Sequence, residues 1–141
     1  MVIEKRKEVR FGVKEPCVVN NGEILTLTMF DGHRMRGVEG KVVDVSKNGI
    51  GIRIEGADDI KVSPGDMIEV HYYDNFDGYF RGVYIVARGE ITRVVKSRNT
   101  INIGVKDVIF NNEDYLQCKL ASVYIEHYGQ PEFSRIASGN L

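Results

Sequence analysis

Residues 41–55 read KVVDVSKNGIGIRIE and predict two β-strands joined by a tight turn. Side chains alternate between the two faces of a strand, so Val43 and Val45 share one face while Asp44 and Ser46 share the other. After the turn, isoleucines alternate with glycine or charged residues, at Ile50, Ile52 and Ile54. Both strands therefore have one apolar face that suits a hydrophobic core.

The dipeptide Asn48-Gly49 favours a tight turn, because both residue types tolerate a positive φ angle. Beside it, the outer face presents a carboxylate and a hydroxyl, from Asp44 and Ser46. Such a polar pair would serve either to cap the turn or to bind a ligand.

The composition of the whole chain sets limits on its class. The chain has 141 residues, which indicates one domain, and 43% of them are hydrophobic, which is enough for a core. Nineteen basic and 20 acidic residues give a net charge of -1, so any anion site must be local. No apolar run is long enough for a membrane span or a signal peptide, so we expect a cytoplasmic protein without membrane insertion. Cys17 and Cys118 lack a CxxC spacing, which favours free buried thiols over a disulfide.

Most of the chain has the pattern of short strands separated by turns. The expected strands are residues 17–19, 23–30, 38–46, 49–55, 67–73, 80–95 and 100–110. The segment 80–95 is either one long strand or a bulged pair, with Gly82 and Gly89 as candidate bulges. Six or seven strands without a helical period between them predict a mainly β fold, a small antiparallel barrel.

The ends of the chain differ from this pattern. Residues 1–14 are rich in charge and predict a flexible basic arm before a barrel at 15–110. Residues 111–128 predict a C-terminal α-helix that Asn112 caps, followed by a tail at 129–141. The apolar face of this helix, with His127 expected on its buried side, is formed by Leu116, Leu120, Val123, Tyr124 and His127.

Two motifs have residue types that suit a nucleotide. Arg6 and Arg10 are four residues apart, so their planar guanidinium groups converge on one target and donate to phosphate or stack on flat rings. The carboxylate of Asp44 accepts two hydrogen bonds, as the edge of guanine requires, and Ser46 adds a hydroxyl. Gly49 permits close approach to the backbone. Taken singly, RxxxR is more often part of a solvated arm, and the hexapeptide is more often an ordinary capped hairpin.

Together, RxxxR followed by DxSxxG resembles the PilZ family of bacterial receptors for cyclic di-GMP. The resemblance covers about residues 4–128 and implies a six-stranded barrel with a preceding arginine arm and a following helix. Two features depart from the family pattern. The segment between the motifs is long, because residues 20–40 form an extended hairpin, and Asp107 stands where an aromatic residue is common.

The resemblance also implies roles for individual residues. Arg6 and Arg10 would contact phosphate and stack on guanine. Asp44 and Ser46 would contact a guanine edge, and Gly49 would keep the turn open. Further candidate contacts, among them a cation that influences ligand stoichiometry and a stacking cation, are Lys5, Asn48 and Arg53.

Other constellations point to less specific functions. The histidines at 33, 71 and 127 are scattered, so we expect no metal and no cofactor. Asp44 and Ser46 have no histidine nearby in sequence, so we expect no enzymatic activity. An aromatic cluster suits packing, a partner surface or a platform for single-stranded nucleic acid, and consists of Tyr72, Tyr73, Phe76, Tyr79 and Phe80.

The sequence thus predicts a stand-alone receptor that binds cyclic di-GMP, orders its arm and thereby alters the binding of a protein partner. The resemblance implies a partner from a motility system or from surface-polysaccharide and biofilm formation. Two alternatives remain. One is a small barrel that binds RNA or single-stranded DNA, against which the near-neutral charge counts. The other is a PilZ-like interaction module that no longer binds ligand.

Overall fold

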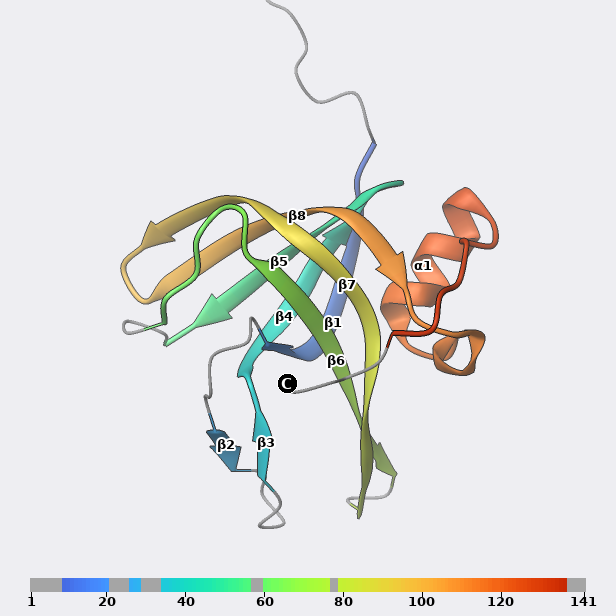
Figure 1. Ribbon diagram of the computed structural model, residues 1–141, viewed down its shortest axis with the longest axis horizontal. Helices are drawn as coiled ribbons and strands as arrows, with labels where there is room; N and C mark the ends of the chain where they lie inside the picture. Colours follow the sequence, from blue (N-terminus) through green and yellow to red (C-terminus); the bar gives the residue numbers. More distant parts are fainter. Residues whose placement is uncertain (1–8, 21–25, 29–33, 57–59, 77–78, 137–141) are drawn as a thin grey trace, which may run out of the picture.

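The computed structural model describes residues 9–20, 26–28, 34–56, 60–76 and 79–136 (Figure 1). At 26–28, 34–36, 73–76 and 79–83 only the backbone is described. Lys5 and Arg6, and with them most of the predicted arm, lie outside these ranges.

The main body is a closed antiparallel barrel of six strands. These strands are β1 (Phe11–Asn20), β4 (Val38–Val45), β5 (Gly49–Glu55), β6 (Met67–Phe76), β7 (Tyr79–Ser97) and β8 (Thr100–Phe110). Around the barrel they follow the order β1-β4-β5-β8-β7-β6, and β6 pairs with β1 to close it. The predicted mainly β antiparallel barrel with a C-terminal helix is confirmed. β1 begins at Phe11, four residues before the expected start of the barrel at 15.

A separate two-stranded sheet lies between β1 and β4 in the sequence. It consists of β2 (Thr26–Thr28) and β3 (Arg34–Arg36), whose backbones pair antiparallel. Figure 1 shows this hairpin projecting from the barrel, at the lower left. The extended segment between the two motifs therefore leaves the pairing of β1 with β4 intact.

The isoleucines of β5 fill the barrel interior as their alternation predicts, since Ile50, Ile52 and Ile54 are all buried. In β4 the expected alternation is wrong. Val42 and Val45 are buried, whereas Val43 is only half-buried. The register between β4 and β5 shifts between Val42 and Asp44, and a bulge of this kind breaks the two-residue period of side chains.

The long strand β7 is one continuous element with bulges. Its register with β8 shifts between Arg88 and Glu90, on either side of Gly89. A Cβ at Gly89 would lie 2.5 Å from a methyl carbon of Val105, so glycine is needed at this bulge. Another shift, in the pairing with β6, adjoins Gly82. Both glycines thus lie at or beside irregularities, as predicted.

The C-terminal helix starts later than the sequence predicts. Asn112 caps a short 3-10 helix, η1 (Glu113–Tyr115), through its Oδ1 and the N–H of Asp114. The α-helix itself, α1 (Lys119–Tyr128), ends at Gly129, where φ is 80°. It packs on β1 and β4 through Leu120 and Ala121, both buried (Figure 1).

The cap of α1 comes from the barrel. Cys118 at the N-cap position makes no side-chain cap hydrogen bond. Instead the carboxylate of Glu15, a buried residue of β1, accepts the N–H groups of Lys119 at 2.6 Å and Leu120 at 3.2 Å. A negative charge at a helix N-terminus is favourable, and Glu15 therefore joins strand and helix.

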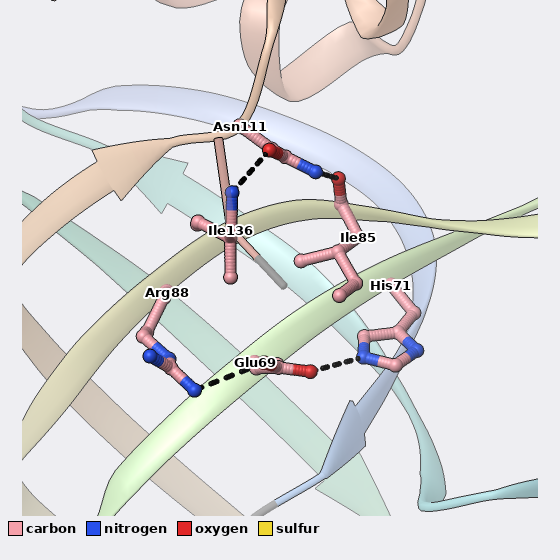
Figure 2. Close-up of polar contacts among 6 residues, drawn as sticks. All are labelled: Glu69, His71, Ile85, Arg88, Asn111 and Ile136. Carbon is pink, nitrogen blue, oxygen red and sulfur yellow. Dashed lines mark hydrogen bonds and ion pairs between the residues drawn. The ribbon is translucent and has the colours of Figure 1, made fainter. Parts of the chain in front are cut away.

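The segment after α1 returns to the barrel. Figure 2 shows Asn111 donating from Nδ2 to the carbonyl of Ile85 at 2.9 Å and accepting the N–H of Ile136 at 2.8 Å. Phe133 forms a parallel bridge with Phe110, which adds a second attachment. The described part of the predicted tail is thus held against the ends of β7 and β8.

Candidate functional site

Arg10 and Asp44, one from each predicted motif, are in direct contact. Arg10 directly precedes β1, and β1 pairs with β4 so that Gly12 lies opposite Asp44. Nη1 of Arg10 donates to Oδ1 of Asp44 at 2.6 Å. The two side chains are 25% and 33% exposed, so the ion pair remains open to solvent. The barrel register therefore brings together residues that lie 34 positions apart.

Ser46 is buried, whereas the sequence predicted a hydroxyl presented on the outer face beside Asp44. It is 1% exposed, and its Oγ donates to the carbonyl oxygen of Gly49 at 3.3 Å. Its backbone N–H donates to the same carbonyl at 2.8 Å. These two hydrogen bonds from Ser46 hold the turn closed, on the side where the turn approaches Arg10.

Gly49 is required for a reason that the sequence did not show. Neither Asn48 nor Gly49 has a positive φ angle. A Cβ at Gly49 would lie 2.6 Å from the carbonyl oxygen of Val105, so β8 leaves no space for a side chain. The same Cβ would lie 3.8 Å from Nη2 of Arg10, which places the turn beside the guanidinium. The exposed Asn48 accepts the N–H of Val108 through its carbonyl at 3.2 Å and ties the turn to β8.

Arg53 lies further along β5, on the outer face as predicted. Its Nε donates to Oδ1 of Asn102 on β8 at 3.3 Å. The side chain borders a shallow hollow of about 300 Å³, whose described lining is Glu39, Gly40, Lys41, Arg53 and Glu55. Two cations and two carboxylates line it, and none of these residues belongs to the Arg10–Asp44 pair.

Helix α1 contacts the chain on both sides of Arg10. Oη of Tyr128 donates to the carbonyl of Val9 at 2.6 Å. The ring of His127 stacks on Phe11, with centroids 3.5 Å apart and planes 4° from parallel. His127 as a residue is exposed, which corrects its expected position on the buried side of the helix. The ring instead covers the first residue of β1.

The same helix also contacts the turn of the second motif. Oη of Tyr124 donates to the carbonyl of Lys47 at 2.8 Å, in the middle of DxSxxG. Sequence reasoning did not identify Tyr128 or this role of Tyr124. The signal was present, because residues four apart on a helix share a face and both are tyrosines. α1 therefore lies beside both motifs.

The remaining sequence candidates either make other contacts or lie outside the described residues. His71 contacts the buried Glu69 at 3.0 Å, and Arg88 donates to the other oxygen of Glu69 at 3.2 Å (Figure 2). This cluster stabilises a buried carboxylate between β6 and β7. Lys5, Arg6 and His33 lie outside the described residues, as do the side chains of Tyr73, Phe76, Tyr79 and Phe80. Tyr72 is half-buried and packs against the core.

The described residues contain neither a metal-ligand cluster nor a membrane-spanning helix. Within those ranges, no group of three or more histidine, cysteine, aspartate or glutamate side chains is placed to hold a metal ion. None of the helices described is long and apolar enough to cross a membrane.

The Arg10–Asp44 pair offers a planar cation and a carboxylate side by side, which suits the recognition of an anionic ligand with hydrogen-bond donors.

Comparison with known proteins is consistent with this fold. The family model described as PilZ domain matches residues 4–121. The structure is similar to that of the Bacillus subtilis inhibitor of motility (MotI/DgrA), with a TM-score of 0.51 and 12% sequence identity. The similar region covers 89% of this chain and 52% of that protein's chain. It is also similar to Escherichia coli YcgR in complex with c-di-GMP, with a TM-score of 0.43 and 14% sequence identity. Here the similar region covers 89% of this chain and 46% of the YcgR chain. The chain spans about half the length of each. No curated protein matches it in sequence.

Proposed function

The chain belongs to the PilZ domain family, and on that premise we propose that it is a non-enzymatic adaptor that binds cyclic di-GMP. The observation that carries the proposal is the contact between Arg10 and Asp44, which unites the two motifs at one solvent-accessible point. Cyclic di-GMP has two anionic phosphates and two guanines. A planar cation and a carboxylate are the groups that such a ligand needs.

The free energy of hydrogen bonds to a charged ligand exceeds that of this ion pair, so replacing the pair by ligand contacts is favourable. A partly exposed ion pair contributes about 0–1 kcal/mol to stability. Hydrogen bonds to charged groups contribute about 1.5–3 kcal/mol each. A ligand that offers phosphate to Arg10 and a guanine edge to Asp44 therefore gains more than the lost pair costs.

The proposed signal is ordering of the N-terminal arm over the barrel face that carries Asp44. Arg6 and Lys5, which precede the described residues, would add cations there. Val9 and Lys47 are each held by a tyrosine of α1, so a ligand between the motifs would bear on this helix as well. The arm and α1 together would then present a changed surface to a partner protein. The name of the inhibitor of motility makes motility systems the first place to seek that partner. The family resemblance makes surface-polysaccharide systems the second.

The test is a calorimetric titration with cyclic di-GMP, compared with GTP and cyclic di-AMP. Arg10→Ala removes one guanidinium and should weaken binding about ten- to a hundred-fold. Arg98→Ala, which removes an exposed arginine in the β7–β8 turn, is the matched control and should leave the affinity unchanged.

Two results would contradict the proposal. Folded protein that shows neither heat nor a thermal shift with cyclic di-GMP would indicate an interaction module without ligand. Strongly salt-dependent binding of single-stranded nucleic acid, without selectivity for the guanine dinucleotide, would indicate the nucleic-acid-binding alternative.

A further inference from the structure

The outer face of the barrel has a strip without side chains next to Asp44. Asp44 of β4 pairs with Gly51 of β5, and Gly51 pairs with Gly104 of β8. Gly104 in turn pairs with Arg93 of β7. These four residues form one row across four neighbouring strands, with a carboxylate at one end, an arginine at the other and two glycines between them.

The row faces outward. Ile50 and Ile52 on either side of Gly51 are buried in the core, as are Ile103 and Val105 on either side of Gly104. Because successive residues of a strand point to opposite faces, the two glycine positions lie on the outside. A Cβ at Gly51 would lie 2.5 Å from Oδ1 of Asp44, so the carboxylate reaches over this end of the strip.

Arg93 reaches over the other end. A Cβ at Gly104 would lie 3.6 Å from Cβ of Arg93 and 3.8 Å from its Nε, so the side chain of Arg93 lies over Gly104, which is buried. Arg53 is hydrogen-bonded to Asn102 and Arg88 to Glu69. Within the described part of the chain, by contrast, Arg93 makes no hydrogen bond or ion pair. Its guanidinium is therefore available to a ligand.

We propose that a guanine base lies on the strip of Gly51 and Gly104 with its edge toward Asp44, and that the planar guanidinium of Arg93 covers it. This inference rests on the proposed function and adds a contact from β7, outside both motifs. Three strand spacings of about 4.8 Å separate the Cα atoms of Asp44 and Arg93 by roughly 14 Å. The exposed side chain of Arg93, which lies over Gly104 in this structure, would lift to admit the base beneath it. Glycine permits close approach of the ring to the backbone, and arginine stacks on π-systems in a way that lysine does not.

The experiment measures the dissociation constant of cyclic di-GMP for a set of Arg93 variants. Arg93→Ala should weaken binding about ten-fold, and Arg93→Lys should remain weakened because it keeps the charge but not the plane. Arg98→Ala, which removes the same charge from the exposed turn after β7, should change the affinity less than about two-fold.

A second variant tests the strip itself. A Cβ at Gly104 would make only ordinary contacts with Thr92 and Arg93, and valine suits a strand, so Gly104→Val should fold. Its methyl groups would stand where the base is proposed to lie, and binding should weaken while the thermal unfolding temperature is retained.

The outcomes separate the two proposals. If the wild type does not bind cyclic di-GMP, the proposed function and this inference both fail. If Arg10→Ala weakens binding but Arg93→Ala stays within about two-fold of wild type, the function stands and the role of Arg93 is wrong. Full affinity in Arg93→Lys would also overturn the inference, since stacking would then be unnecessary.

Discussion

Glu15 affects both cysteines of the chain as well as the helix that it caps. Cys17 and Cys118 are free and buried, as the sequence favoured. Burial, with a further contribution from the charge of Glu15, raises the pKa of Cys17 to about 12 and that of Cys118 to about 12. Both thiols are therefore neutral in the folded protein at physiological pH.

These thiols predict a loss of stability in alkaline solution. In the unfolded chain they titrate near pH 9.0, so the unfolded state releases their protons first as the pH rises. The stabilisation is complete below that pH and is lost between about pH 9 and 12. Urea unfolding at about pH 7.5 and about pH 10.5 should show it, and the loss should be smaller in the Cys17→Ala/Cys118→Ala double variant. An equal loss in both proteins would contradict the assignment.

Among the elements, β1 and α1 depend on each other more than their separation in sequence suggests. Glu15 lies 104 residues before Lys119, yet it supplies the acceptor for the first N–H groups of the helix. Phe11, the first residue of the same strand, stacks on His127, and Val9, just before the strand, accepts a hydrogen bond from Tyr128 at the end of the helix. The helix is thus attached to β1 near both of its ends, and one of these attachments adjoins Arg10.

Removing the charge of Glu15 should loosen this attachment. Glu15→Gln keeps the shape of the side chain but weakens two hydrogen bonds, and we expect a loss of about 1–3 kcal/mol in the free energy of unfolding. Glu126→Gln, a matched change on an exposed position of α1, should stay within about 0.5 kcal/mol of wild type. Urea unfolding measures both, and similar midpoints for the two variants would show that the cap contributes nothing.

For the molecule as a whole, closure of the barrel brings the start of β1, the turn at Gly49 and helix α1 to one place. A ligand bound there contacts elements from the beginning, middle and end of the chain. Binding to the folded state alone should therefore stabilise the whole domain against unfolding.

The thermal shift follows from this linkage. Cyclic di-GMP at a hundred times its dissociation constant should add about 2.7 kcal/mol, which for a chain of this size raises Tm by roughly 6–11 °C. At the same concentration Arg10→Ala should show a smaller shift. An equal shift with cyclic di-AMP would contradict specific recognition of guanine. Differential scanning fluorimetry is sufficient for this measurement.

The amino-acid sequence by itself determined the class of fold and the composition of the candidate site. The alternation of Ile50, Ile52 and Ile54 identified a strand and its buried face, because a period of two residues is a local property. The two motifs selected Arg10 and Asp44, and in the structure Nη1 of Arg10 lies 2.6 Å from Oδ1 of Asp44.

Only the tertiary structure decided how far each polar group is buried and what surrounds it. Ser46 became buried at the turn, β8 excluded a side chain at Gly49, and Glu15 supplied the cap of α1. The alignment of Arg93 with Asp44 across two glycines likewise depends on the register of four strands. Such contacts join residues far apart in the chain, and no local period of the sequence encodes them.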